Sequence, residues 1–206
     1  MKVLMVNGSP RKDSNTQIGL DEMIKIFEAD GIDVECLQIG AQDIRGCIAC
    51  NKCSELGKCV FDDVVNEAAE KLKEADGMVV ASPVYYGCAN GTIINFLDRL
   101  FYSTGSLDKT MKVGAAVACA RRAGTTFTFD NLNKYFFISG MPVASGRYWN
   151  AVHGATPGEA AQDAEGLAHM RILARNMVFL MKSIALGKDQ FGIPETESYD
   201  FTNFIR

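Results

Sequence analysis

Short apolar segments alternate with helical patterns along this chain of 206 residues, and this alternation restricts its fold more than any other feature. Residues 2–7 form a largely apolar run of the kind found in buried parallel strands. The apolar residues that follow are spaced as on one face of an amphipathic helix: Leu20, Met23, Ile24 and Phe27. The chain therefore begins with a strand–helix unit.

The same unit recurs downstream. Further strands are expected at residues 32–39, 77–81, 112–119 and 142–147, and helices at about 62–74, 93–100, 126–138 and 159–184. Five strands separated by helices predict an α/β fold, in which a doubly wound parallel sheet lies between two helical layers. We expect one domain over residues 1–187, with a cysteine-rich loop at 44–61 inserted after the second strand, and a C-terminal tail at 188–206.

A polar loop at residues 8–16 separates the first strand from the first helix. The unpaired N–H groups and the dipole of a helix N-terminus favour an anion at such a position. The loop also offers side-chain donors suited to phosphate oxygens: Ser9, Arg11, Ser14, Asn15 and Thr16. It lacks the Gly-Lys-Ser/Thr ending of a Walker A motif. A simply N-capped helix uses the same residue types, so this loop alone leaves both interpretations open.

A second loop, at residues 82–87, follows the third strand. In a sheet ordered 2-1-3-4-5, the first and third strands flank the topological switch point, where ligands bind. Pro83 stiffens this loop, Tyr85 and Tyr86 offer aromatic faces, and Gly87 allows close approach to a flat ring. A buried tyrosine pair beside a turn is the alternative. Two such loops converging on one crevice favour a bound ligand.

Together with residues 95–99 (Asn-Phe-Leu-Asp-Arg), these loops resemble the NADPH-dependent FMN reductase family of flavodoxin-like proteins. The resemblance is good over about residues 1–120, and it implies FMN as cofactor and NAD(P)H as co-substrate. It implies phosphate contacts from Ser9, Arg11, Ser14, Asn15 and Thr16, and ring contacts from Pro83, Val84, Tyr85, Tyr86 and Gly87. Arg121 would lie on the far side of the ring, where the family pattern is rich in Gly and Ser.

Four cysteines lie within thirteen residues in the pattern C-x2-C-x2-C-x5-C: Cys47, Cys50, Cys53 and Cys59. Short runs of this kind supply the converging thiolates of a 4Fe–4S cluster, and the spacing resembles that of the iron–sulfur flavoproteins, a branch of the same family. A zinc site or redox-labile free thiols would use the same residues. Because the loop follows the second strand, we expect it on the same sheet edge as the FMN.

These features predict an FMN-dependent oxidoreductase that passes electrons from NAD(P)H or a redox partner to a quinone, flavin or other acceptor. The alternative is a non-enzymatic iron–sulfur flavoprotein that exchanges electrons with ferredoxin-like proteins. No catalytic acid or base is needed, and none stands out. With a net charge of −4, no basic run and no long apolar segment, we expect neither nucleic-acid nor membrane binding. We expect a cytoplasmic homodimer or homotetramer.

Overall fold

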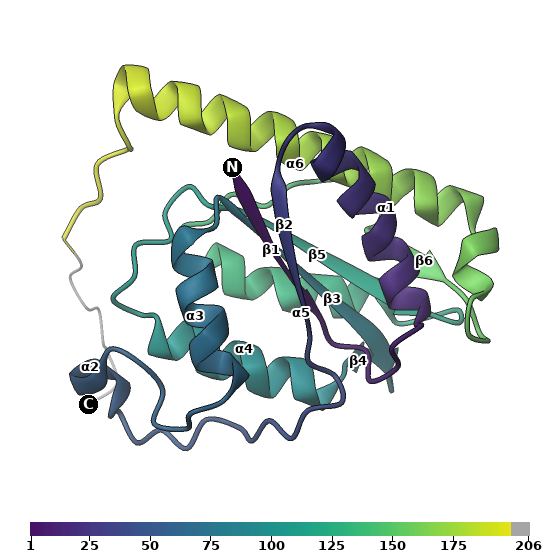
Figure 1. Cartoon of the computed structure of the whole chain (residues 1–206), viewed down its shortest axis with the longest axis horizontal. Coiled ribbons are helices and arrows are strands. Elements are labelled where there is room, and N and C mark those ends of the chain that lie inside the picture. Colours follow the sequence, from purple (N-terminus) through teal and green to yellow (C-terminus); the bar gives the residue numbers. More distant parts are fainter. Residues whose placement is uncertain (199–206) are drawn as a thin grey trace, which may run out of the picture.

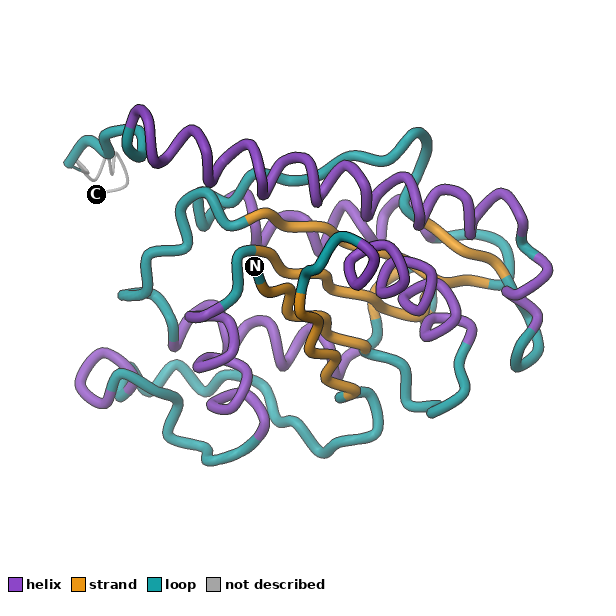
Figure 2. The backbone as a smooth tube through the Cα atoms, turned by 45° about the horizontal axis from the view of Figure 1, so that its top comes forward, coloured by secondary structure: helices purple, strands orange, loops and turns teal. Residues whose placement is uncertain are grey.

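A parallel β-sheet forms the middle layer of the protein in the computed structural model, which describes residues 1–198 (Figure 1, Figure 2). Its strands, in the order β2-β1-β3-β5-β6, are β2 (Asp33–Gln38), β1 (Lys2–Asn7), β3 (Gly77–Tyr85), β5 (Val113–Ala120) and β6 (Ala151–His153). A short β4 (Cys88–Ala89) pairs with the end of β3 as an antiparallel hairpin. Apart from this hairpin, the predicted strand order 2-1-3-4-5 is confirmed.

Two helical layers cover the sheet because neighbouring strand residues point to opposite faces. Val3 and Met5 contribute to a core with α1 (Asn15–Ala29) and α6 (Ala164–Phe191). Leu4 and Val6 contribute to the core on the other face. The helices of that face are α3 (Val64–Glu74), α4 (Gly91–Ser103) and α5 (Thr125–Phe137). The fold is thus the predicted three-layer, doubly wound arrangement.

The fifth strand was placed wrongly. Residues 142–147 form only an isolated bridge, Val143 with Gly114, and the strand beside β5 is β6, several residues later. Between the two, the chain leaves the sheet, and Trp149 lies against Phe129 of α5 with ring centroids 5.9 Å apart. The apolar segment 142–147 has the pattern of a strand, but only its first residues, 142–144, hydrogen-bond to Gly114 of β5 before the chain leaves the sheet.

The remaining segments differ from expectation mainly in detail. The cysteine-rich loop contains one short helix, α2 (Cys53–Leu56), and a 3-10 turn, η1 (Glu159–Gln162), precedes α6. Helix α6 continues to Phe191, into the segment expected as a tail. Of that tail, residues 199–206 lie outside the described part of the chain. Within residues 1–198, no helix is both long and apolar enough to cross a bilayer.

Candidate functional site

A crevice of about 170 Å³ opens at the carboxyl ends of β1, β3 and β5. The side chains predicted to bind phosphate line it, together with Pro83, Val84, Tyr85 and Arg121: Ser9, Arg11, Ser14, Asn15 and Thr16. Tyr86 and Gly87 do not line it. The structure therefore brings the two predicted loops together at the switch point of the sheet.

The N-terminus of α1 forms the polar end of this crevice. Ser14 is the N-cap, and its hydroxyl accepts a hydrogen bond from the Gln17 N–H at 3.0 Å. Ser9, Ser14 and Thr16 are all nearly buried, and all three line the crevice. Because the first N–H groups of a helix have no intrahelical partner, an anion here would meet several donors and the positive end of the dipole.

Neighbouring elements hold the backbone of the 8–16 loop in place. The side-chain amide of Gln38, at the end of β2, donates to the carbonyls of Arg11 at 2.7 Å and Ser9 at 3.2 Å. Gly40 packs directly beneath the loop: a Cβ at this position would lie 2.1 Å from the Gly8 carbonyl oxygen. The loop is thus fixed by contacts from the next strand, which preorganises the anion site.

The side chain of Asn15, which is predicted to contact the phosphate, lines the crevice and also bonds to a distant segment of the chain. Its amide nitrogen donates to the Thr156 carbonyl at 2.8 Å, and its carbonyl oxygen accepts from the Ala160 N–H at 3.0 Å. The side chain therefore joins the 8–16 loop to the segment that follows β6. This segment supplies a third wall of the crevice, from Gly154, Ala155 and Pro157. Sequence reasoning missed this wall because it placed the fifth strand several residues too early.

The other end of the crevice is formed by the β3–β4 hairpin. Tyr86 and Gly87 make its two-residue turn, both with positive φ (51° and 82°), as in a type I′ turn. Tyr86 is fully exposed and is not among the residues that line the crevice. Gly124, before α5, packs on this hairpin so closely that a Cβ would lie 2.8 Å from Val84 Cγ1. This packing brings the loop that carries Arg121 against the hairpin.

Cys119 closes the floor of the crevice from β5. Burial raises the pKa of its thiol to about 11, and a hydrogen bond from Thr16 offsets part of that effect. The group is therefore a neutral thiol at physiological pH. It contributes shape to the crevice rather than charge or nucleophilicity.

The four clustered cysteines line a second, much smaller cavity of about 20 Å³, together with Phe61, Arg99 and Tyr102. Ala49 and Asn51, on either side of Cys50, have positive φ (51° and 57°), which is costly for residues other than glycine. Such left-handed turns produce the backbone concavities found at many anion and iron–sulfur sites. Within residues 1–198, however, no group of side chains is already arranged as a metal site.

Helix α4 determines where this second cavity lies. The cysteine loop lies along α4 and is bonded to it at two points. Asn95 donates to the Ile44 carbonyl at 2.9 Å, and the Tyr102 hydroxyl donates to the side-chain oxygen of Asn51 at 2.6 Å. Since α4 runs back from the carboxyl edge of the sheet, the loop is carried toward the opposite edge. The expectation that the cysteines share an edge with the crevice is therefore wrong. Figure 1 shows α2 well separated from β4, and the two cavities share no lining residue.

Residues 1–156 match the sequence model of the NADPH-dependent FMN reductase family, which is about three quarters of the chain. The chain belongs to this family. Its members are flavin-dependent, so the chain is an FMN-binding redox protein, either an oxidoreductase or an electron carrier. The crevice at the switch point is the place in this FMN reductase fold where such a cofactor is expected.

Curated relatives of this FMN reductase family member are named iron–sulfur flavoproteins. One from Methanocaldococcus jannaschii is 33% identical over 191 residues, covering 89% of this chain and 99% of the relative. One from Methanosarcina thermophila is 27% identical over 193 residues, covering 92% and 100%. Among solved structures, RosB with a bound riboflavin-phosphate intermediate has a TM-score of 0.69 at 16% identity, covering 100% of this chain and 92% of RosB. A Streptococcus flavodoxin (TM-score 0.56, 17% identity, 87% and 99% covered) shares the fold.

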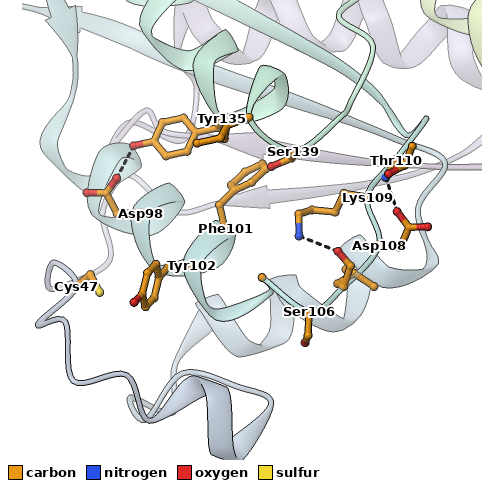
Figure 3. A pocket seen from close by; sticks show the side chains of 13 residues that line it. Cys47, Asp98, Phe101, Tyr102, Ser106, Asp108, Lys109, Thr110, Tyr135 and Ser139 are labelled. Carbon is orange, nitrogen blue, oxygen red and sulfur yellow. Dashed lines mark hydrogen bonds between the residues drawn. The ribbon is translucent and has the colours of Figure 1, made fainter. Parts of the chain in front are cut away.

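A third and separate feature is a cavity of about 710 Å³ (Figure 3). It lies between α4, α5 and the segment 105–110, and contains none of the predicted FMN contacts. Asp98 accepts a hydrogen bond from Tyr135 at 2.6 Å on its wall, and burial together with that bond raises the pKa of Tyr135. Cys47 and Tyr102 line both this cavity and the cysteine cavity. The cysteine region is therefore open to solvent through a broad groove.

Proposed function

We propose that this protein is an electron-transfer flavoprotein that carries FMN in the crevice and a 4Fe–4S cluster on Cys47, Cys50, Cys53 and Cys59. The observation that carries this proposal is that each of two cavities is lined by one set of donors. Phosphate donors surround the α1 N-terminus in the crevice, and four thiols surround the smaller cavity. The relatives named iron–sulfur flavoproteins support it.

The phosphate end of the crevice fits FMN well. Ser9, Ser14 and Thr16 supply hydroxyls, Arg11 a guanidinium, and α1 its N-terminal N–H groups. Asn15 assists indirectly by joining the 154–160 segment to the loop. The cavity is smaller than the roughly 300 Å³ of common cofactor sites. We therefore assign it to the phosphate and the ribityl chain.

The flavin ring then lies at the open mouth, against the hairpin residues Val84 and Tyr85, with Tyr86 and Gly87 at its rim and Arg121 opposite. Bound FMN supplies hydride and single-electron chemistry, while the protein supplies orientation and access. Tyr86 is exposed at this mouth, so a second subunit of a homodimer or homotetramer could complete the ring site. An open ring face would also admit NAD(P)H, a quinone or another flavin.

The cysteine cavity fits a cluster in donor type and number. Four thiols line one space, an arginine lies beside them, and the loop contains left-handed turns. The cavity is only about the size of one water molecule, so we expect the loop to open outward around a cluster. A bound cluster would supply one-electron exchange with ferredoxin-like proteins, which could approach through the neighbouring groove.

The test is to purify the protein anaerobically and to measure flavin, iron and acid-labile sulfide. We expect about one FMN per chain and about four iron and four sulfide. The flavin should then be reduced faster by reduced ferredoxin than by NADH or NADPH. Absence of the ~450 nm flavin band would contradict the proposal.

A plain NAD(P)H:FMN reductase is the second candidate, and one observation favours it: within residues 1–198 the thiols are not pre-arranged as a metal site. It predicts flavin without iron, and rapid bleaching by a nicotinamide. The same preparation decides between the two, since iron content and the preferred electron donor are measured together.

A further inference from the structure

Arg99 carries a buried positive charge outside the FMN crevice. It lies on α4, and only 1% of its surface is exposed. A charge taken out of water is costly unless it is paired and fully hydrogen-bonded. The residue belongs to the 95–99 segment, none of whose residues lines the crevice. Its contacts therefore indicate what this charge does.

The guanidinium of Arg99 ties together both ends of the cysteine loop. Its two terminal nitrogens donate to the Asp63 carboxylate at 2.7 and 3.0 Å, a bidentate ion pair. The same nitrogens donate to the carbonyls of Phe61 at 3.2 Å and Arg45 at 3.5 Å. The side chain thus links the segment before the first cysteine to the segment after the last.

The Nε–H of Arg99 donates to the sulfur of Cys59 at 3.3 Å, and Nη2, whose N–H groups are shared with Asp63 and Phe61, lies at the same distance from that sulfur. Asn66 fixes the backbone of the same cysteine from both sides: it accepts from the Cys59 N–H at 3.0 Å and donates to the Cys59 carbonyl at 3.1 Å. Cys59 is therefore held in place by side chains of α3 and α4 before any metal binds.

We propose that Arg99 is a positioning residue that presents Cys59 as a ligand of the cluster, and that the Arg99–Asp63 pair sets the reduction potential of that cluster. The inference rests on the proposed 4Fe–4S function. Reduction adds one electron from the donor, hence one negative charge, and no bond to sulfur is broken. Hydrogen bonds to ligand sulfurs and nearby positive charge raise the potential. Asp63 opposes this effect because its carboxylate repels the added electron.

The experiment compares midpoint potentials of anaerobically purified Arg99→Gln and Asp63→Asn with the wild-type protein. Loss of the arginine charge should lower the potential, and loss of the carboxylate should raise it. We expect about a tenfold change in the reduced-to-oxidised ratio at fixed ambient potential, or about 59 mV for one electron. Lys58→Gln, which removes an exposed positive charge next to Cys59, is the matched control and should shift the ratio less than threefold.

A purely structural role of Arg99 predicts a different result. Both variants would then lose iron or stability, without opposite shifts of potential. If Arg99→Gln fails to hold iron, Arg99→Lys retains the charge but not the paired donors, and its potential should lie below that of the wild type. Shifts of equal sign in iron-loaded variants overturn this inference alone. Absence of iron and sulfide from the wild-type protein overturns the proposed cluster and this inference with it.

Discussion

At the scale of single residues, close backbone packing shapes the crevice more than any one polar side chain. Gly40 lies so near the 8–16 loop that a Cβ would come within 2.1–2.4 Å of the backbone of Gly8 and Ser9. Contacts that short do not occur, so any side chain here would displace the loop. The 8–16 loop can take up its conformation because Gly40, in the turn after β2, has no side chain.

Replacing Gly40 with alanine should therefore weaken FMN binding. Because the added methyl group displaces the loop carrying Ser9, we expect the Kd for FMN to rise about tenfold or more, or ~1.4 kcal/mol. Fluorescence quenching of FMN measures this change. Gly187→Ala is the control: no atom lies within 4 Å of its Cβ, and in helix α6 it should raise the free energy of unfolding by about 0.5 kcal/mol. Unchanged FMN affinity in Gly40→Ala would contradict the packing argument.

At the scale of elements, the proposed site would use the same residues of α1 to cap the helix and to bind the cofactor. Its N-cap hydroxyl, on Ser14, satisfies the N–H of Gln17. Asn15 and Thr16 of its first turn line the crevice, where N–H groups without an intrahelical partner would be available to an anion. The start of the helix and the proposed binding site therefore coincide. The effect of Ser14 on stability can be separated from its effect on FMN affinity by changing the charge at the cap.

Two substitutions at Ser14 make that separation. Ser14→Ala removes the cap, and we expect it to lower the free energy of unfolding by about 1 kcal/mol and to weaken FMN binding. Ser14→Asp retains a good cap but places a negative charge at the phosphate position, so stability should be preserved while FMN affinity falls further. Chemical denaturation and FMN titration of both variants provide the two readouts. If Ser14→Asp bound FMN as the wild type does, the phosphate would lie elsewhere.

At the scale of the whole molecule, the two candidate redox sites lie apart. The FMN crevice is at the carboxyl edge of the sheet, whereas α4 carries the cysteines toward the opposite edge. Electrons would have a shorter path if the flavin of one subunit faced the cysteines of another. This arrangement links electron transfer to the predicted homo-oligomer.

Mixed oligomers test this arrangement. Co-expressed Gly40→Ala and Cys50→Ser subunits carry complementary defects, one in flavin binding and one in the cluster. At an FMN concentration well below the raised Kd of Gly40→Ala, we expect each variant alone to show little flavin reduction by reduced ferredoxin. Doubly tagged mixed oligomers should recover a substantial fraction, measured by stopped-flow absorbance. Isolated mixed oligomers that stay inactive would place the electron path within one subunit.

Local patterns of sequence were sufficient to predict the alternating strands and helices and the polar loop before α1, and to reveal the spacing of the cysteines. Each depends on residues only a few positions apart, so periodicity and capping reveal it. Long-range contacts decided the rest. Regular pairing with β5 occurs at β6 rather than at 142–147, and the segment after β6 forms the third wall of the crevice and bonds to Asn15. Contacts with α4 moved the cysteines to the opposite edge and placed Arg99 beside Cys59. No local pattern encodes which distant surface a loop will pack against.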